Sequence, residues 1–158
     1  MFKSHLKICD ELCNETISHA YIFSGESGVG KFTMAKSFAR MILNEEHLLR
    51  IEGIDEYEHP DLLVLDGKLS KSQVDDMILE SLSLPYEAKN KIYIINHFED
   101  LSIEGQNAIL KTLEEPPEYL IIILVTSNIS KLLPTIISRS RVLSISSVAT
   151  SDLRSFIE

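Results

Sequence analysis

Short apolar runs and longer amphipathic stretches alternate along the chain. Five of the runs are rich in isoleucine, leucine and valine and almost continuously apolar, and they lie at residues 20–23, 61–66, 91–96, 119–127 and 141–146. Strands that are covered on both faces of a parallel sheet have this composition, because neither face is left to water. The pattern therefore predicts five buried strands.

The stretches between these runs have the period of amphipathic helices. Helices are expected at residues 2–17, 31–43, in a segment after Ser70, and at 102–113. Ser70 and Gln73 have the spacing of a capping box, and Pro116 and Pro117 cannot continue a helix. Strand and helix in repetition predict the α/β class, with an open parallel five-stranded sheet flanked by helices and ligands at the carboxyl ends of the strands.

Composition narrows the class of protein. The chain has 158 residues, of which 44% are hydrophobic, so one domain with one core is expected. The net charge is -9, with 24 acidic and 15 basic side chains, which argues against a broad electrostatic contact with DNA. The longest apolar run has strand length, so no membrane span is predicted. Cys9 and Cys13 are too few for a disulfide framework and no leader-like segment opens the chain, which together favour a cytoplasmic location.

The stretch "SGESGVGKFT" at residues 24–33 nearly spells a phosphate-binding loop between a predicted strand and a predicted helix. The residues in register with that motif are Gly25, Gly28, Gly30 and Lys31. Backbone N–H groups and the helix dipole would converge there on an anion. Phe32, however, takes the place of the Ser or Thr that holds magnesium. Thr33 comes one residue late, about 100° further around the helix, so it is not expected to aim at the same point.

A second motif is more specific than the loop. "NAILKTLEEPPE" at residues 107–118 precedes a strand, "TSN" at 126–128 and "TIISRS" at 135–140. With these motifs the chain resembles the clamp-loader subunits of bacterial DNA polymerase III, which are AAA+ proteins. The resemblance runs from about His19 to Ile145.

This resemblance implies a domain organisation. Residues 1–147 are expected to form a P-loop AAA+ nucleotide-binding-type domain with a RecA-like sheet. Residues 148–158 resemble the start of the helical lid that follows this domain in the family. The rest of the lid and the carboxyl-terminal collar are not expected within this chain.

The resemblance also locates the other half of a nucleotide site. In ATPase members of the family the strand before the "LKTLEEPPE" helix ends in Asp-Glu, and Asn96 and His97 fall at these two positions. Both acids are missing, as is the hydroxyl that Phe32 replaces. The combination resembles the delta-prime type of subunit, which keeps the AAA+ shape, usually lacks ATPase chemistry and serves as the fixed end of the loader ring. We therefore expect no ATPase activity and no required cofactor, with weak binding of ATP or ADP still compatible.

Ser138 and Arg139 match the Ser-Arg-Cys motif of the family, with Ser140 in place of the cysteine. On composition alone, Arg139 is a solvated loop arginine. The resemblance instead implies an arginine finger that acts in trans on the ATP site of a neighbouring subunit, with Arg141 as the second candidate. Thr126 matches a position from which such proteins sense a nucleotide, although a buried threonine at a strand end fits equally well.

Partners and metals follow from the same resemblance. It implies a hetero-oligomer with gamma or tau and delta subunits inside the DNA polymerase III holoenzyme, which reaches the sliding clamp and primed DNA indirectly. Related subunits commonly carry a four-cysteine zinc module between the loop helix and the second strand. Only His47 and His59 occur there, so no zinc or other metal is expected.

Two other functions stay open. An active gamma/tau-type ATPase would need Thr33 and Asn96 to rebuild the metal site. A small phosphotransferase would also use a phosphate loop, but no basic lid is visible in the sequence, and the "LKTLEEPPE" stretch would then have no explanation.

Overall fold

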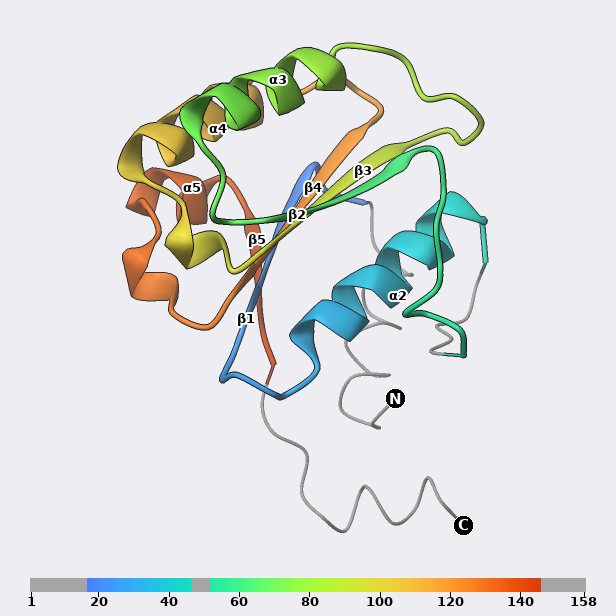
Figure 1. Ribbon diagram of the computed structural model, residues 1–158, viewed down its shortest axis with the longest axis horizontal. Helices are drawn as coiled ribbons and strands as arrows, with labels where there is room; N and C mark the ends of the chain where they lie inside the picture. Colours follow the sequence, from blue (N-terminus) through green and yellow to red (C-terminus); the bar gives the residue numbers. More distant parts are fainter. Residues whose placement is uncertain (1–16, 47–51, 146–158) are drawn as a thin grey trace, which may run out of the picture.

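A computed structural model describes residues 17–46 and 52–145 of the chain (Figure 1). Its strands are β1 (Ala20–Ser24), β2 (Leu62–Asp66), β3 (Lys91–Asn96), β4 (Leu120–Thr126) and β5 (Arg141–Ser144). They form one sheet in the order β2-β3-β4-β1-β5, and every pair is parallel. The predicted fold class is thereby confirmed. Residues 2–16 of the predicted helix at 2–17, with both cysteines, and the proposed start of the lid at 148–158 lie outside the described residues.

Helices cover both faces of this sheet. They are α2 (Lys31–Leu43), α3 (Lys71–Ser81), α4 (Ile103–Glu114) and α5 (Pro134–Ser138), and short 3₁₀ turns lie at Phe98–Asp100 and Ile129–Lys131. In Figure 1, α2 lies on one face and the other three helices lie on the opposite face. The capping box of Ser70 and Gln73 is present at the start of α3, as predicted. α4 ends before Pro116, also as predicted.

The core has two parts, because successive side chains of a strand point to opposite faces. Tyr21 and Phe23 of β1 pack against Phe38 of α2, and the Tyr21 and Phe38 rings meet edge to face at 5.2 Å between centroids. Ile22, between them, packs with residues of α3, α4 and α5 on the other face. Among the described residues, no helix combines the length and the apolar character that a membrane crossing requires.

The prediction of five buried strands was wrong for two of them. β1, β3 and β4 are buried over almost their whole length, but residues of β2 and β5 alternate between more and less exposed. Val64 is 39% exposed and Val142 is 37% exposed. β2 and β5 are the edge strands of the sheet, so each has a neighbouring strand on one side only. An apolar run alone does not distinguish an edge strand from a central one.

Two buried charges fix the connection between α3 and β3. The Asp61 carboxylate, in front of β2, accepts backbone hydrogen bonds from Tyr86, Glu87 and Ala88. Burial alone would raise the pKa of Asp61, but these donors hold its pKa below the usual value. From the other side, buried Lys91 donates to the carbonyl oxygens of Glu80 and Ser83 at the end of α3. The connection is therefore held at both ends.

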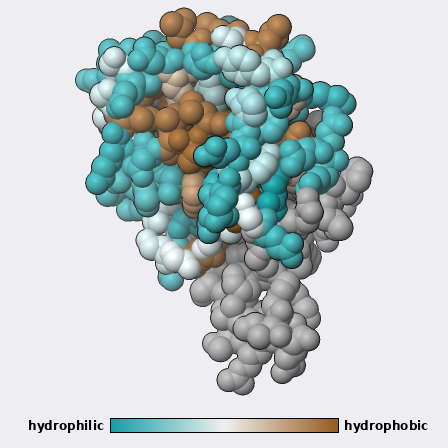
Figure 2. Space-filling view, turned by 45° about the vertical axis from the view of Figure 1, so that its right-hand side comes forward, coloured by the Kyte–Doolittle hydropathy of each residue, from teal (hydrophilic) through white to brown (hydrophobic). Residues whose placement is uncertain are grey.

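This connection presents apolar side chains to solvent. Leu79 and Leu82 at the end of α3 are 69% and 65% exposed, and Leu84 beyond them is 75% exposed. Figure 2 shows apolar side chains gathered at the top of the molecule, where α3 lies. Isolated exposed leucines are ordinary, whereas three within six residues form a patch.

Candidate functional site

The phosphate loop lies at the carboxyl end of β1 and leads directly into α2, as the sequence predicts. Gly28 and Gly30 have φ angles of 83° and 88°, which L side chains rarely adopt. Gly30 is the N-cap of α2 and no side chain caps this helix end, so its first N–H groups stay available to an anion. Gly25 is needed for a different reason, since a Cβ there would lie 2.2 Å from the carbonyl oxygen of Ile145.

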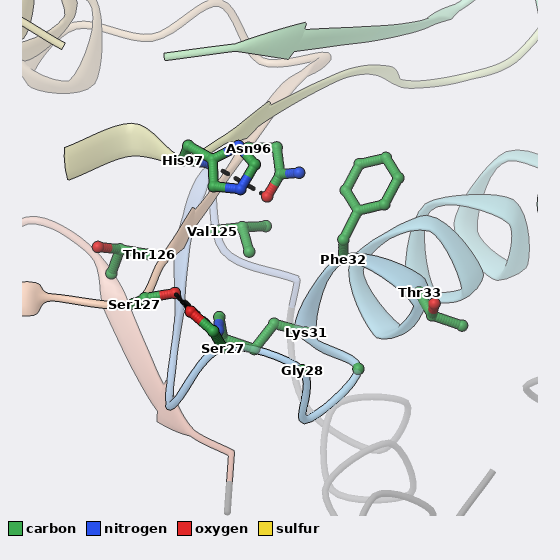
Figure 3. A pocket seen from close by; sticks show the side chains of 11 residues that line it. Ser27, Gly28, Lys31, Phe32, Thr33, Asn96, His97, Val125, Thr126 and Ser127 are labelled. Carbon is green, nitrogen blue, oxygen red and sulfur yellow. Dashed lines mark hydrogen bonds between the residues drawn. The ribbon is translucent and has the colours of Figure 1, made fainter. Parts of the chain in front are cut away.

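A pocket of about 230 Å³ opens above this loop (Figure 3). It brings together most of the residues that the sequence singled out, along with several that it did not. The lining residues are Ser27, Gly28, Gly30, Lys31, Phe32, Thr33, Asn96, His97, Val125, Thr126 and Ser127. Pockets that enclose a small ligand usually measure roughly 300 to 1,000 Å³. The hollow is thus smaller than a pocket that encloses a whole small ligand, and it lies over the phosphate loop.

Lys31 is held inside this pocket by the protein itself. Its side chain is buried, and Nζ donates to the carbonyl oxygen of Glu26 at 2.7 Å and to Oγ of Ser127 at 3.1 Å. Burial lowers the pKa of Lys31, and the nearby Glu99 carboxylate opposes that shift. The ammonium group thus lies where a phosphate-loop lysine meets an anion, and it already donates hydrogen bonds to two oxygen atoms of the protein.

The positions that would hold magnesium carry groups that do not suit it. The Phe32 ring rises from the start of α2 on the side of Asn96 (Figure 3) and packs against the core beneath α2. Oδ1 of Asn96 accepts a hydrogen bond from the backbone N–H of His97 at 3.1 Å. Thr33 projects from α2 away from Asn96 and His97. Magnesium prefers a near-octahedral set of oxygen ligands. The side chains at these positions do not provide such a set.

His97 is engaged with a carboxylate rather than with the loop. Its φ angle is 50°, in the left-handed region, and its Nδ1 lies 2.8 Å from Oδ2 of Asp66 at the end of β2. This hydrogen bond is the main reason that the pKa of Asp66 is lowered. Both side chains are about half exposed. The pair links the ends of β2 and β3, and its His97 lines the pocket.

Ser127, which the sequence analysis did not single out, faces Lys31. Besides the contact with Nζ, its Oγ lies 3.3 Å from Oγ of Ser27, and its backbone N–H donates to Oε1 of Glu99 at 3.3 Å. Thr126 is buried, and its Oγ1 accepts from the backbone N–H of Asn128 at 3.1 Å. The neighbouring Ser127 therefore brings its hydroxyl to the lysine, while the role of Thr126 as a sensor stays a prediction. The sequence signal that could have identified Ser127 is its position directly after a buried strand, at the edge of the sheet where ligands bind.

Arg139 lies far from this pocket. It follows α5 and precedes β5, so it is at the amino end of the sheet, near His19 and Ala20 where β1 begins. The phosphate loop follows the carboxyl end of β1, and these two ends appear at opposite sides of the sheet in Figure 1. A strand of five residues separates them by roughly 13 Å at about 3.3 Å per residue. Arg139 therefore lies at the opposite end of the sheet from the chain's own phosphate loop.

The contacts of Arg139 are weak. Its Nη2 lies 3.8 Å from Oε1 of Glu114, and both side chains are 47% exposed. Ser138 and Ser140 on either side donate to carbonyl oxygens of α5, so the backbone of the Ser-Arg-Ser segment is fixed while the guanidinium stays accessible. Arg141 is half-buried in β5. Of the two arginines, Arg139 is the more accessible.

No group of three or more His, Cys, Asp or Glu side chains that could hold a metal occurs in the part of the chain that the structure describes. His59 lies there, and its Nδ1 accepts from the backbone N–H of Asp61. His47, Cys9 and Cys13 lie outside that part. The expectation of no zinc stays a prediction.

Proteins of similar sequence match this chain over most of its length. The DNA polymerase III subunit tau of Bacillus subtilis is 39% identical over 140 residues, which cover 81% of this chain and 24% of that protein. The subunit delta' of the same organism is 34% identical over 139 residues, covering 82% of this chain and 42% of that protein. The chain thus spans less than half the length of either relative.

Solved structures share the fold. A DNA polymerase III gamma-subunit-related protein from Thermotoga maritima superposes with a TM-score of 0.72 at 21% identity, over 97% of this chain and 49% of that one. A RuvB variant from the same organism gives a TM-score of 0.59 at 16% identity, over 99% of this chain and 48% of that one. The fold is therefore that of the AAA+ P-loop proteins. The family described as "DNA polymerase III, delta subunit" matches residues 4–149, and the chain belongs to that family.

Proposed function

We propose that this chain is the AAA+ domain of a delta-prime-type clamp-loader subunit of DNA polymerase III. In this role it hydrolyses no ATP itself and offers Arg139 as an arginine finger to the ATP site of a neighbouring subunit. The observation that carries the proposal is the phosphate pocket, which keeps its loop and Lys31 but has Phe32 and Asn96 where magnesium ligands would be.

Hydrolysis requires more than a bound phosphate. Phosphoryl transfer depends on a metal ion that bridges the phosphates and on a group that orients the attacking water. Phe32 supplies no oxygen, and the Asn96 oxygen accepts from the His97 N–H. His97 is hydrogen-bonded to Asp66. The remaining groups favour weak binding of a phosphate over its transfer.

The position of Arg139 supports a role in trans. At the amino end of the sheet it does not serve the loop of its own chain, and its ion pair with Glu114 is long and half exposed. An accessible arginine on a fixed backbone segment suits the stabilisation of charge in another subunit's site. Partners in this proposal are gamma or tau and delta subunits, and the acidic chain reaches the clamp and primed DNA through them.

A second candidate is an active gamma/tau-type ATPase. The observation in its favour is the identity of 39% to the Bacillus subtilis tau subunit, against 34% to delta'. This function would need Thr33 and Asn96 to bind the metal. The direction of Thr33 in Figure 3 speaks against that arrangement.

Magnesium-dependent ATP hydrolysis by the purified chain distinguishes the two candidates. We expect no turnover above that of the Lys31→Ala variant, which serves as the matched control because it removes the phosphate-binding charge. Turnover that disappears in Lys31→Ala would establish the ATPase and remove the proposed role. Circular dichroism of both proteins verifies that the substitution leaves the fold intact.

A further inference from the structure

Glu99 places a carboxylate next to Ser127, which lines the phosphate pocket. It belongs to the 3₁₀ turn Phe98–Asp100 that follows β3, at the carboxyl edge of the sheet. Its Oε1 accepts the backbone N–H of Ser127 at 3.3 Å. Its Oε2 is buried and has no hydrogen-bond partner within the ranges 17–46 and 52–145. A carboxylate oxygen in this state is costly unless an opposite charge is near.

The opposite charge is Lys31. The Ser127 backbone N–H bonds Glu99 while the Ser127 hydroxyl bonds the Lys31 ammonium, so one residue bridges the two charged groups. The Glu99 carboxylate also opposes the lowering of the pKa of Lys31 that burial causes. With the carbonyl oxygen of Glu26 on the same ammonium, the lysine is surrounded by internal acceptors.

We propose that Glu99 is a built-in counter-ion that weakens binding of a nucleotide's terminal phosphate at this loop. A phosphate-loop lysine reaches the β- and γ-phosphates, so the Lys31 ammonium marks where these groups would lie. An incoming phosphate has to share Lys31 with Glu99 and is repelled by the Glu99 carboxylate. A third charge on a triphosphate increases this repulsion, so the site is expected to favour a nucleoside diphosphate over a triphosphate.

Glu99 thereby determines whether the site prefers a nucleoside diphosphate or a triphosphate. Under the proposed function, this site binds a nucleotide without hydrolysing it. The inference rests on that proposal for the identity of the ligand, but the two fail separately. Binding is measured on the isolated chain with no hydrolysis and no partner subunit, whereas the role in clamp loading is read from an assembled complex.

The test is the affinity of the 158-residue chain for ADP and ATP, measured by isothermal titration calorimetry without magnesium. Glu99→Gln keeps the size of the side chain and an oxygen for the Ser127 N–H, and it should tighten ADP binding on the order of tenfold at low salt. The gain should be larger for ATP than for ADP, and it should shrink as salt screens the repulsion. Glu99→Ser carries the same expectation if Glu99→Gln is poorly folded.

Asp100→Asn is the matched control, because it removes the same charge from the next residue of the turn, where the side chain is exposed. It should leave both affinities unchanged. An equal gain in Asp100→Asn would reduce the effect to net charge and overturn the proposal. Unchanged or weaker binding in Glu99→Gln would also overturn it, as would a failure of every folded variant to bind ADP.

Discussion

Rebuilding the magnesium site tests whether Phe32, Asn96 and His97 are the residues that abolish it. The perturbation is the triple variant Phe32→Thr, Asn96→Asp and His97→Glu. It supplies a hydroxyl at the start of α2 and two carboxylates at the end of β3. Since the loop amides and Lys31 are already in place, the variant should bind Mg-ADP more tightly than the wild type.

The structure also predicts what the variant loses. Phe32 packs against the core beneath α2, and its partial burial contributes roughly 2 kcal/mol to the free energy of unfolding. The exposed His97–Asp66 pair contributes at most about 1 kcal/mol, and His97→Glu replaces it with two facing carboxylates. We therefore expect the metal-free triple variant to be about 3 kcal/mol less stable than the wild type.

Isothermal titration with ADP, in magnesium and in EDTA, measures the gain. Because metal-site substitutions commonly change metal affinity by about 10- to 100-fold, a gain of that order is expected in magnesium and none in EDTA. Adding Asp66→Asn should recover part of the lost stability, since it removes the facing carboxylate. Phe32→Thr alone is the control, because it lacks the acidic half of the site.

Two results would refute this reasoning. A triple variant that is folded but binds Mg-ADP no better than the wild type would show that Asn96 and His97 do not face the metal position. A gain of equal size in EDTA would show that the loss of the Phe32 ring, and not a metal ligand, opened the pocket.

Two further predictions concern stability, each measured by denaturant unfolding. Asp61→Asn leaves backbone N–H groups of the α3–β3 connection without a carboxylate, so it should cost about 2 to 4 kcal/mol at neutral pH. Because the pKa of Asp61 is lowered in the fold, the wild type should lose this contribution as the pH falls below about 4, and an equal loss in Asp61→Asn would contradict the assignment. Tyr93→Phe should be neutral or stabilising by up to about 1.5 kcal/mol, because the buried Tyr93 hydroxyl has no partner among the described residues. Its control, Tyr119→Phe, removes a 2.8 Å hydrogen bond to Ser81 and should destabilise by about 1 kcal/mol.

The central elements of the fold were predictable because their signals are local. A continuous apolar run such as β4 has few alternatives to a buried strand, and the Ser70–Gln73 pair marks a helix start by its own hydrogen bonds. α5 was missed because five residues are too short to show a helical period. The exposure of β2 and β5 depends on strand order, which no single run encodes.

Only the part of the site with a local sequence signal could be predicted. The loop glycines and Lys31 form a contiguous motif, whereas Ser127 and the Glu99 carboxylate bonded to it follow two other strands. Their roles depend on which strands are neighbours and on how the turns after them bend. The opposite placement of Arg139 and the loop likewise follows from the parallel sheet, once it is known that α5 leads into β5 beside β1.

One measurement separates a subunit that hydrolyses ATP from one that only assists a neighbour. It is the DNA-stimulated ATPase rate of a reconstituted clamp loader that contains the full-length subunit as wild type, Lys31→Ala, Arg139→Ala or Arg141→Ala, with assembly verified by gel filtration. Arginine fingers contribute about 10³- to 10⁵-fold at the site they serve, so Arg139→Ala should remove nearly all the turnover of the neighbouring site. Lys31→Ala and Arg141→Ala should leave the rate unchanged. A rate that falls with Lys31→Ala and persists with Arg139→Ala, in an intact complex, would contradict the account.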